Sequence, residues 1–108
     1  MAALPTGRCN VTDNPRATVC LTFDFDAISI WIGPMASKSP SMISRGEFGA
    51  VAARRILTLL EREQIPGTFF IPGHTVETYP EIIREIVAAG HEIGHHGYLH
   101  ENPLALET

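Results

Sequence analysis

The chain has 108 residues, a mass of 11.8 kDa and a formal charge of −4, from 8 Lys and Arg against 12 Asp and Glu. This acidic balance argues against nucleic acid or an anionic membrane as a partner, because both require a basic protein face. The hydrophobic share of 44% excludes a disordered chain, and no apolar run reaches the roughly 18 residues of a membrane span. The opening residues lack the apolar stretch of a secretory signal, so we expect a cytoplasmic location.

Residues 1–17 combine Pro, Gly, Asn and Asp without periodicity, which predicts an irregular lead-in to one domain over residues 18–108. The two cysteines, Cys9 and Cys20, lack a Cys-x-x-Cys spacing, and a cytoplasmic chain keeps its thiols reduced. We expect both thiols to be free and interpret Cys20 as a small buried hydrophobe.

The first regular element predicted is a strand. From Thr18 to Phe25 apolar residues alternate with polar ones, and the pattern continues through Asp26. Residues 27–45 are rich in serine and contain two prolines, which predicts a long loop. Long loops in compact domains are usually functional.

A helix is predicted from Ser44, whose spacing to Glu47 fits a capping box, up to Gln64. Its predicted apolar face consists of Phe48, Ala52, Ile56, Leu59 and Leu60.

Two further strands and one more helix follow. Residues 68–71 indicate a short buried strand, which ends in a turn at residues 72–74. A second helix is predicted from Thr78, with Gly90 as the glycine just beyond its end. A third strand or strand end is then expected over residues 91–97.

This order of strand, helix, strand, helix and strand indicates an α/β fold with parallel strands. Such folds carry their active sites at the carboxyl ends of the strands. Three polar groups fall there: Asp24 with Asp26, then His74, and then the histidine-rich segment 95–100.

Asp24 and Asp26 are two residues apart on the first predicted strand, so their side chains point to the same face with Cα atoms about 6.6 Å apart. One carboxylate can then bind a metal while the other accepts a proton from a water between them. The alternative is a strand end that only caps the following turn.

Four of the five histidines fall within residues 91–100, a density more typical of a metal or proton-transfer site than of a core. His96 and His100 are four apart, the spacing of two side chains on one side of a helical turn, which suits a shared metal. Together with one carboxylate they form a set that leaves coordination positions open, as catalytic metal sites require. A solvated histidine-rich loop is the alternative.

A competing motif overlaps this segment. His91, Glu92 and His95 satisfy the His-Glu-x-x-His pattern of zinc metalloproteases, in which both histidines lie on a helix. Gly90 and Gly94 weaken a helix at this place, and the pattern gives Asp24 and Asp26 no role. We therefore keep the metalloprotease only as an alternative.

With these residues identified, the chain resembles the polysaccharide deacetylases of the NodB-homology group, carbohydrate esterase family four. Thr22-Phe-Asp-Phe-Asp26 is similar to their first motif and His96-Gly-Tyr-Leu-His100 to their second. The chain most closely resembles the branch with peptidoglycan deacetylase-like proteins, allantoinases and cyclic-imide hydrolases. This resemblance lies in the stretches 24–28, 31–33, 66–74 and 90–103.

The resemblance implies a role for each matching residue. Asp24 is then the catalytic base, while Asp26, His96 and His100 bind a divalent metal, with zinc preferred and cobalt, nickel or manganese also accepted. The expected reaction is metal-assisted hydrolysis of an amide, most simply the N-acetyl group of a carbohydrate such as peptidoglycan.

Two further residues, Trp31 and His74, match positions near the site in that branch and are interpreted as supporting residues. The resemblance also implies the fold: the N-terminal part of a distorted (β/α) barrel, with about three parallel strands and two helices. The later motifs of the family, which supply a general acid and oxyanion donors, would lie beyond Thr108.

This partial match leaves two alternatives open and leads to two expectations. A small cyclic amide or imide is the alternative substrate, and a catalytically inert or metal-binding fragment is the non-enzyme alternative. The isolated chain is expected to have little or no deacetylase activity, because each missing catalytic group is worth about a hundredfold or more in rate. We also expect it to self-associate through its open strand edges.

Overall fold

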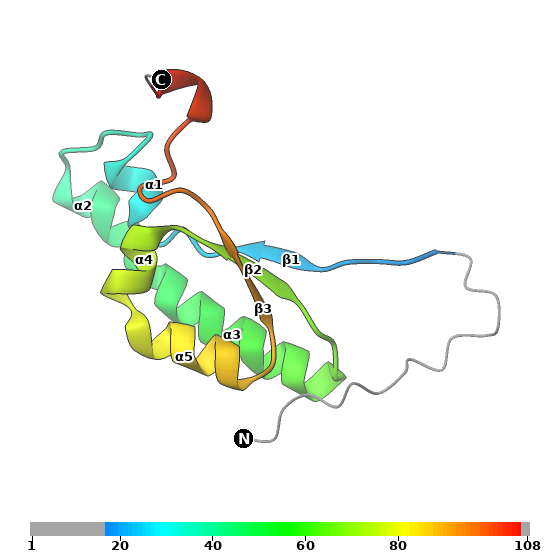
Figure 1. Ribbon diagram of the computed structural model, residues 1–108. Helices are drawn as coiled ribbons and strands as arrows, with labels where there is room; N and C mark the ends of the chain where they lie inside the picture. Colours follow the sequence, from blue (N-terminus) through cyan, green and yellow to red (C-terminus); the bar gives the residue numbers. More distant parts are fainter. Residues whose placement is uncertain (1–16, 107–108) are drawn as a thin grey trace.

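The computed structural model describes residues 17–106, so the irregular lead-in predicted for residues 1–17 lies outside it except for Ala17. One parallel sheet has the strand order β1-β2-β3. Its strands are β1 (Thr22–Asp24), β2 (Thr68–Ile71) and β3 (Glu92–His95). Figure 1 shows the two longest helices, α3 (Phe48–Glu63) and α5 (Pro80–Ala88), side by side against one face of this sheet. The predicted α/β order with parallel strands is therefore confirmed.

The central strand β2 has the bounds predicted from the sequence. Phe69 pairs with Phe23 of β1 on one side and with Ile93 of β3 on the other. Phe69 and Ile71 are each only 1% exposed and pack among the helices, whereas Thr68 and Phe70 are half-buried on the other face. This alternation gives the sheet an apolar face toward the helices and a second face free for other groups.

Helix α3 is confirmed, but its predicted beginning is wrong. Residues 44–47 form a 3₁₀ turn, and the Ser44 hydroxyl donates to the carbonyl of Ser41 instead of capping the helix. The last helical residue, Glu63, is followed by Gln64 with a left-handed φ of 57°. The capping-box spacing is thus present in the sequence without the capping bonds.

The buried face of α3 agrees with the predicted one in part: Leu60 is buried and Ile56 packs against the core, as predicted. Ala53 and Leu60 are buried, while Phe48 and Leu59 are 57% and 47% exposed. Apolar residues occur nearly all round this helix, so two overlapping stripes satisfy the helical period and only packing against the sheet and α5 selects between them. The Phe48 ring is instead covered by Arg55, whose guanidinium carbon lies 5.7 Å from the ring centroid.

Helix α5 begins at Pro80 rather than at Thr78, because a short helix, α4 (Gly73–Thr78), occupies the place of the predicted turn at residues 72–74. The predicted end is confirmed. Gly90 has a φ of 83°, its N–H donates to the carbonyl of Val87, and the N–H of His91 donates to the carbonyl of Ile86. These are the two bonds of a Schellman motif, and glycine adopts the required left-handed conformation without strain.

The prediction of a long loop over residues 27–45 is wrong. This stretch contains the one-turn helices α1 (Ser29–Ile32) and α2 (Pro40–Ile43) and runs into the 3₁₀ turn. Single helical turns escape a periodicity analysis because they are shorter than one repeat of an apolar stripe. The segment is consequently an ordered cap beside the carboxyl end of β1.

Strand β1 is shorter than the predicted strand over residues 18–26. One ladder bond continues on each side, from the Thr68 N–H to the Leu21 carbonyl and from the Phe25 N–H to the Phe70 carbonyl. Residues before Leu21 extend past the end of β2, so Cys20 is exposed and free rather than buried as predicted. Cys9 lies outside the described residues.

No helix within residues 17–106 combines the length and the apolar character needed to cross a bilayer. The cytoplasmic location stays a prediction.

Candidate metal centre

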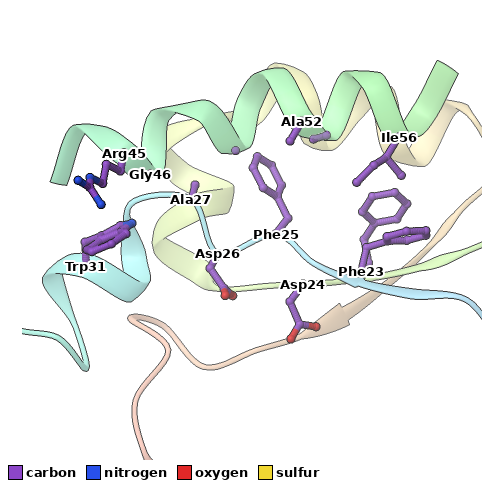
Figure 2. Close-up of a pocket in the computed structure, with 13 residues that line it drawn as sticks. Phe23, Asp24, Phe25, Asp26, Ala27, Trp31, Arg45, Gly46, Ala52 and Ile56 are labelled. Atoms are coloured by element: carbon purple, nitrogen blue, oxygen red, sulfur yellow. The ribbon is translucent and has the colours of Figure 1, made fainter. Parts of the chain in front are cut away.

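Asp24 is the last residue of β1 and Asp26 follows two residues later, and both carboxylates point away from the helix α3. Figure 2 shows Phe23 and Phe25 directed toward α3, and Asp24 and Asp26 directed away from it. Phe23 stacks on Phe69 with ring centroids 5.2 Å apart, which fixes the apolar side of the strand. The alternation of the first motif therefore brings both carboxylates to the same side, as expected from their spacing.

Asp26, His96 and His100 come together at the carboxyl ends of β1 and β3. The Nε2 atom of His96 lies 3.5 Å from Oδ1 of Asp26, and Nε2 of His100 lies 3.9 Å from Oδ2 of Asp26. One ligand atom from each of the three residues lies within 4.8 Å of the other two. Among the described residues, this is the group whose His, Cys, Asp or Glu side chains are arranged to bind a metal ion.

The unpaired polar atoms of this cluster fit a divalent metal. Oδ1 of Asp26 and Nε2 of His96 are buried and find no hydrogen-bond partner within residues 17–106. A buried polar atom without a partner destabilises the folded chain unless it binds a ligand, an ion or a water. Burial raises the pKa of Asp26, and the nearby His100 and His96 oppose this rise. Two imidazoles and one carboxylate form a donor set typical of catalytic zinc sites.

Asp24 differs from Asp26 in exposure, and it approaches His96 alone whereas Asp26 approaches both His96 and His100. Its side chain is 55% exposed, against 19% for Asp26, and its Oδ2 lies 3.7 Å from Nε2 of His96. Asp24 thus lies beside the three-residue cluster and faces solvent. This position leaves its carboxylate accessible to a substrate or a water.

The spacing of His96 and His100 was interpreted as that of a helical turn, but the turn between them is not helical. Gly97 and His100 have φ angles of 69° and 56°, and the two imidazole rings pack edge to face with centroids 4.4 Å apart. The carboxylate of Glu101 accepts the N–H groups of Tyr98 and Leu99, each at 2.9 Å. These bonds lower the pKa of Glu101.

Sequence reasoning missed Glu101, because its role depends on the shape of the turn. The usable signal is a carboxylate placed directly after the second histidine of the motif. Reasoning from the sequence also missed Ser29 and Thr75, which are fully buried and donate to the backbone of Asp26.

A groove of about 220 Å³ lies between residues 23–27 and α3, and Asp24 and Asp26 are among its lining residues, but their carboxylates point away from α3 (Figure 2). Its lining is apolar over most of its length, with Trp31 and Arg45 close to the carboxyl end of β1. Trp31, interpreted above as a supporting residue, therefore borders a cavity that Asp24 and Asp26 share. Arg45 was not predicted.

His74, the other supporting residue, lies outside the cluster of possible metal ligands. Its Nδ1 atom is buried without a partner among the described residues, and its ring packs edge-on against Tyr98 at 6.2 Å. His74 consequently contacts the turn that carries His96 and His100.

The metalloprotease alternative is wrong. His91, Glu92 and His95 fall on an extended segment, with Glu92–His95 forming β3, whereas the pattern requires both histidines on one helix. His91 is 7% exposed and its Nδ1 accepts the N–H of Gly67 at 3.1 Å. Burial lowers the pKa of His91.

Comparison with known proteins agrees with this geometry. Residues 12–108 match the polysaccharide deacetylase family model. A peptidoglycan deacetylase of Helicobacter pylori is 48% identical over 85 residues, which are 77% of this chain and 29% of the relative.

Two solved structures are similar. A crystal structure assigned as a polysaccharide deacetylase from Mycobacterium smegmatis has a TM-score of 0.74 at 42% identity, over 82% of this chain and 32% of the other. An allantoinase has a TM-score of 0.58 at 29% identity, over 73% of this chain and 33% of the other. The chain thus spans about a third of the length of these proteins, and its predicted fold type is confirmed. The chain belongs to the polysaccharide deacetylase family.

Proposed function

We propose that this chain supplies the metal ligands and the catalytic base of an enzyme that hydrolyses the N-acetyl group of an amino sugar. One observation carries the proposal: ligand atoms of Asp26, His96 and His100 lie within 4.8 Å of one another beside the exposed carboxylate of Asp24. Zinc suits two imidazoles and one carboxylate best, and cobalt, nickel or manganese bind the same donor types.

The chain's own residues then divide the chemistry. When bound, a divalent metal polarises the amide carbonyl and makes a water more acidic. Asp24 is the residue to remove the proton from that water, because its carboxylate is exposed and borders the ligand cluster. Asp26 binds the metal and does not transfer protons, because its side chain is only 19% exposed and lies close to both histidines. The C–N bond then breaks to give acetate and a free amine.

The substrate class rests on the relatives. The Helicobacter pylori protein is named a peptidoglycan deacetylase, which supports an N-acetylated carbohydrate as the substrate. The chain matches about a third of that protein, so we propose that further substrate-binding and proton-donating groups lie outside the matched third.

A cyclic amide or imide is the second candidate substrate. The allantoinase, whose structure is 29% identical, supports it, because its name specifies a cyclic substrate on the same fold. Both reactions break an amide C–N bond, and both require Asp24 as the base and the same residues as metal ligands. The two candidates therefore differ in the substrate pocket and not in the proposed centre.

A chimaera tests the proposal. Residues 18–103 replace the matched segment of the Helicobacter pylori relative, and release of acetate from an N-acetylglucosamine oligomer is measured beside ring opening of allantoin. We expect acetate release, with a loss of about a hundredfold or more for Asp24→Asn. Exposed Glu92 provides the matched control, Glu92→Gln. Faster allantoin opening favours the second candidate, and an Asp24→Asn chimaera as active as the parent overturns the role of Asp24 as the catalytic base.

A further inference from the structure

Resting on the proposed metal centre, we propose that Gly73–Thr75, at the beginning of α4, is a positioning segment that sets the distance between Asp26 and the two histidines. The ligands follow the two outer strands, which do not pair with each other. Helix α4, which follows the central strand β2, has hydrogen bonds to both sides of the cluster.

One half of this connection is a buried hydroxyl on the backbone of Asp26. Thr75 is 0% exposed, and its Oγ1 donates to the Asp26 carbonyl at 2.8 Å, across 49 positions of sequence. The same carbonyl accepts the hydroxyl of Ser29, also 0% exposed, at 2.6 Å and the N–H of Ser29 at 3.0 Å. Three donors thus fix the peptide group from which the Asp26 side chain departs.

The other half reaches the histidine turn. The N–H of Gly73 donates to the carbonyl of Gly97, and the N–H of His74 donates to the carbonyl of Tyr98, both at 2.9 Å. These two carbonyls lie within the four-residue step from His96 to His100. A Cβ atom on Gly73 would lie 2.8 Å from Cδ2 of Tyr98, so the close approach requires glycine.

Three consecutive residues therefore hold the backbone on both sides of the ligand cluster. None of them is a ligand in the cluster, so they act through Asp26, His96 and His100. Groups that orient metal ligands from behind typically change metal affinity by about 10–100-fold when they are removed. The same contacts explain why a six-residue helix follows β2 where the sequence predicted a turn.

Thr75→Val tests the proposal, because it removes the hydroxyl and keeps the shape of the side chain. Zinc affinity of the 108-residue chain is measured by competition with a chromogenic chelator, and the Co²⁺ absorption spectrum reports ligand geometry. We expect the Kd of Thr75→Val to rise about 10–100-fold with an altered Co²⁺ spectrum. Thr75→Ser keeps the hydroxyl and is expected to retain the parent spectrum.

Thr78→Val is the matched control on the same helix. Thr78 is exposed and its hydroxyl donates only to the carbonyl of His74, one turn back, so its Kd should stay within about twofold to threefold of the parent value. A Thr75→Val variant that binds zinc as tightly as the parent overturns the positioning role.

A second variant covers the case in which circular dichroism shows that Thr75→Val does not fold. Gly73→Ala places a methyl group against the Tyr98 ring in the histidine turn and is expected to weaken zinc binding in the same direction. An unchanged Kd for Gly73→Ala then overturns the proposal. Asp26→Ala distinguishes a failure of the proposed metal centre from a failure of the positioning role. If this variant binds zinc like the parent, the proposed metal centre itself is wrong, whatever Thr75→Val does.

Discussion

The two ends of β1 are built differently. At its carboxyl end, Asp26 is held by buried hydroxyls and lies against His96 and His100 from the far side of the sheet. Toward its amino end, Val19 is 80% and Leu21 39% exposed. The carboxyl end of β1 thus leads into a buried polar cluster, and its amino end carries exposed apolar side chains.

This difference separates two kinds of surface. The residues of the polar cluster all lie within residues 22–101, at the carboxyl ends of β1 and β3 and in the turns after them. Within residues 17–106 one edge of β1 is not paired with another strand, and an unpaired strand edge is a surface on which other chains can pair.

Truncating the shared core should have the largest effect on stability. Phe69 is 1% exposed and contacts both Phe23 and His91, so Phe69→Ala is expected to destabilise the chain by about 3–5 kcal/mol. Urea denaturation followed by circular dichroism measures this loss. Leu59→Ala on the exposed side of α3 is the control and should stay within about 0.5 kcal/mol. Equal losses would mean that α3 packs through its predicted face instead.

The open edge gives the second prediction, which concerns association. We expect the chain to self-associate and Leu21→Lys to shift it toward the monomer, because a charged side chain on an edge strand opposes pairing with another chain. Sedimentation velocity over a concentration series measures the shift. Val87→Lys, on exposed α5, is the matched control and should leave association unchanged. A parent chain that is monomeric throughout the series would contradict this prediction.

A fall in pH should lower the stability of the folded chain through protonation of His91 in the unfolded chain. Burial lowers the pKa of His91 below its ordinary value of 6.5, so only the unfolded chain takes up a proton as the pH first falls below 6.5. The stability contribution is therefore complete above pH 6.5 and is lost as the pH falls toward the folded-state pKa. His91→Asn keeps an acceptor for the Gly67 N–H without titrating in this range. Urea midpoints at about pH 7.5 and about pH 5 should differ less for this variant than for the parent. An equal pH dependence would be evidence against a neutral, buried His91.

The smallest effect is expected from the ion pair between α3 and α5. Arg54 binds Glu85 through two nitrogens, with an N–O distance of 2.9 Å, but the side chains are 50% and 40% exposed. Solvent screening makes the contribution of such a pair to stability small. A double-mutant cycle with Arg54→Ala and Glu85→Ala measures the coupling free energy, which should be the smallest of the effects predicted here and should shrink in high salt. A coupling free energy that does not change with salt would show that the helix contact is more desolvated than the exposures indicate.

The sequence predicts the parts of the fold that depend on local pattern. The strand at residues 68–71 and the end of α5 at Gly90 follow from alternation and from helix-end chemistry, and both are confirmed. The face of α3 was predicted only in part: Ile56 and Leu60 pack in the core, but Phe48 and Leu59 are exposed although they also fit the helical period. Choosing between the two stripes needs the position of the sheet, which no local pattern contains.

The candidate site divides in the same way. Asp24, Asp26, His96 and His100 could be predicted from spacing and resemblance, and the structure brings them together. Thr75 could not be predicted, because it is far from Asp26 in sequence and its hydroxyl has no motif of its own. Such contacts depend on the tertiary arrangement of β2 and the helix that follows it.

The central claim is that this chain alone carries a metal centre at Asp26, His96 and His100, and zinc titration of the 108-residue chain by calorimetry tests it most directly. We predict one bound ion per chain, lost in Asp26→Ala and in His96→Ala. Asp24→Asn and His95→Ala should retain it, because Asp24 lies beside the cluster and His95 is exposed on β3. Binding that survives Asp26→Ala, or that disappears in His95→Ala, would contradict the account.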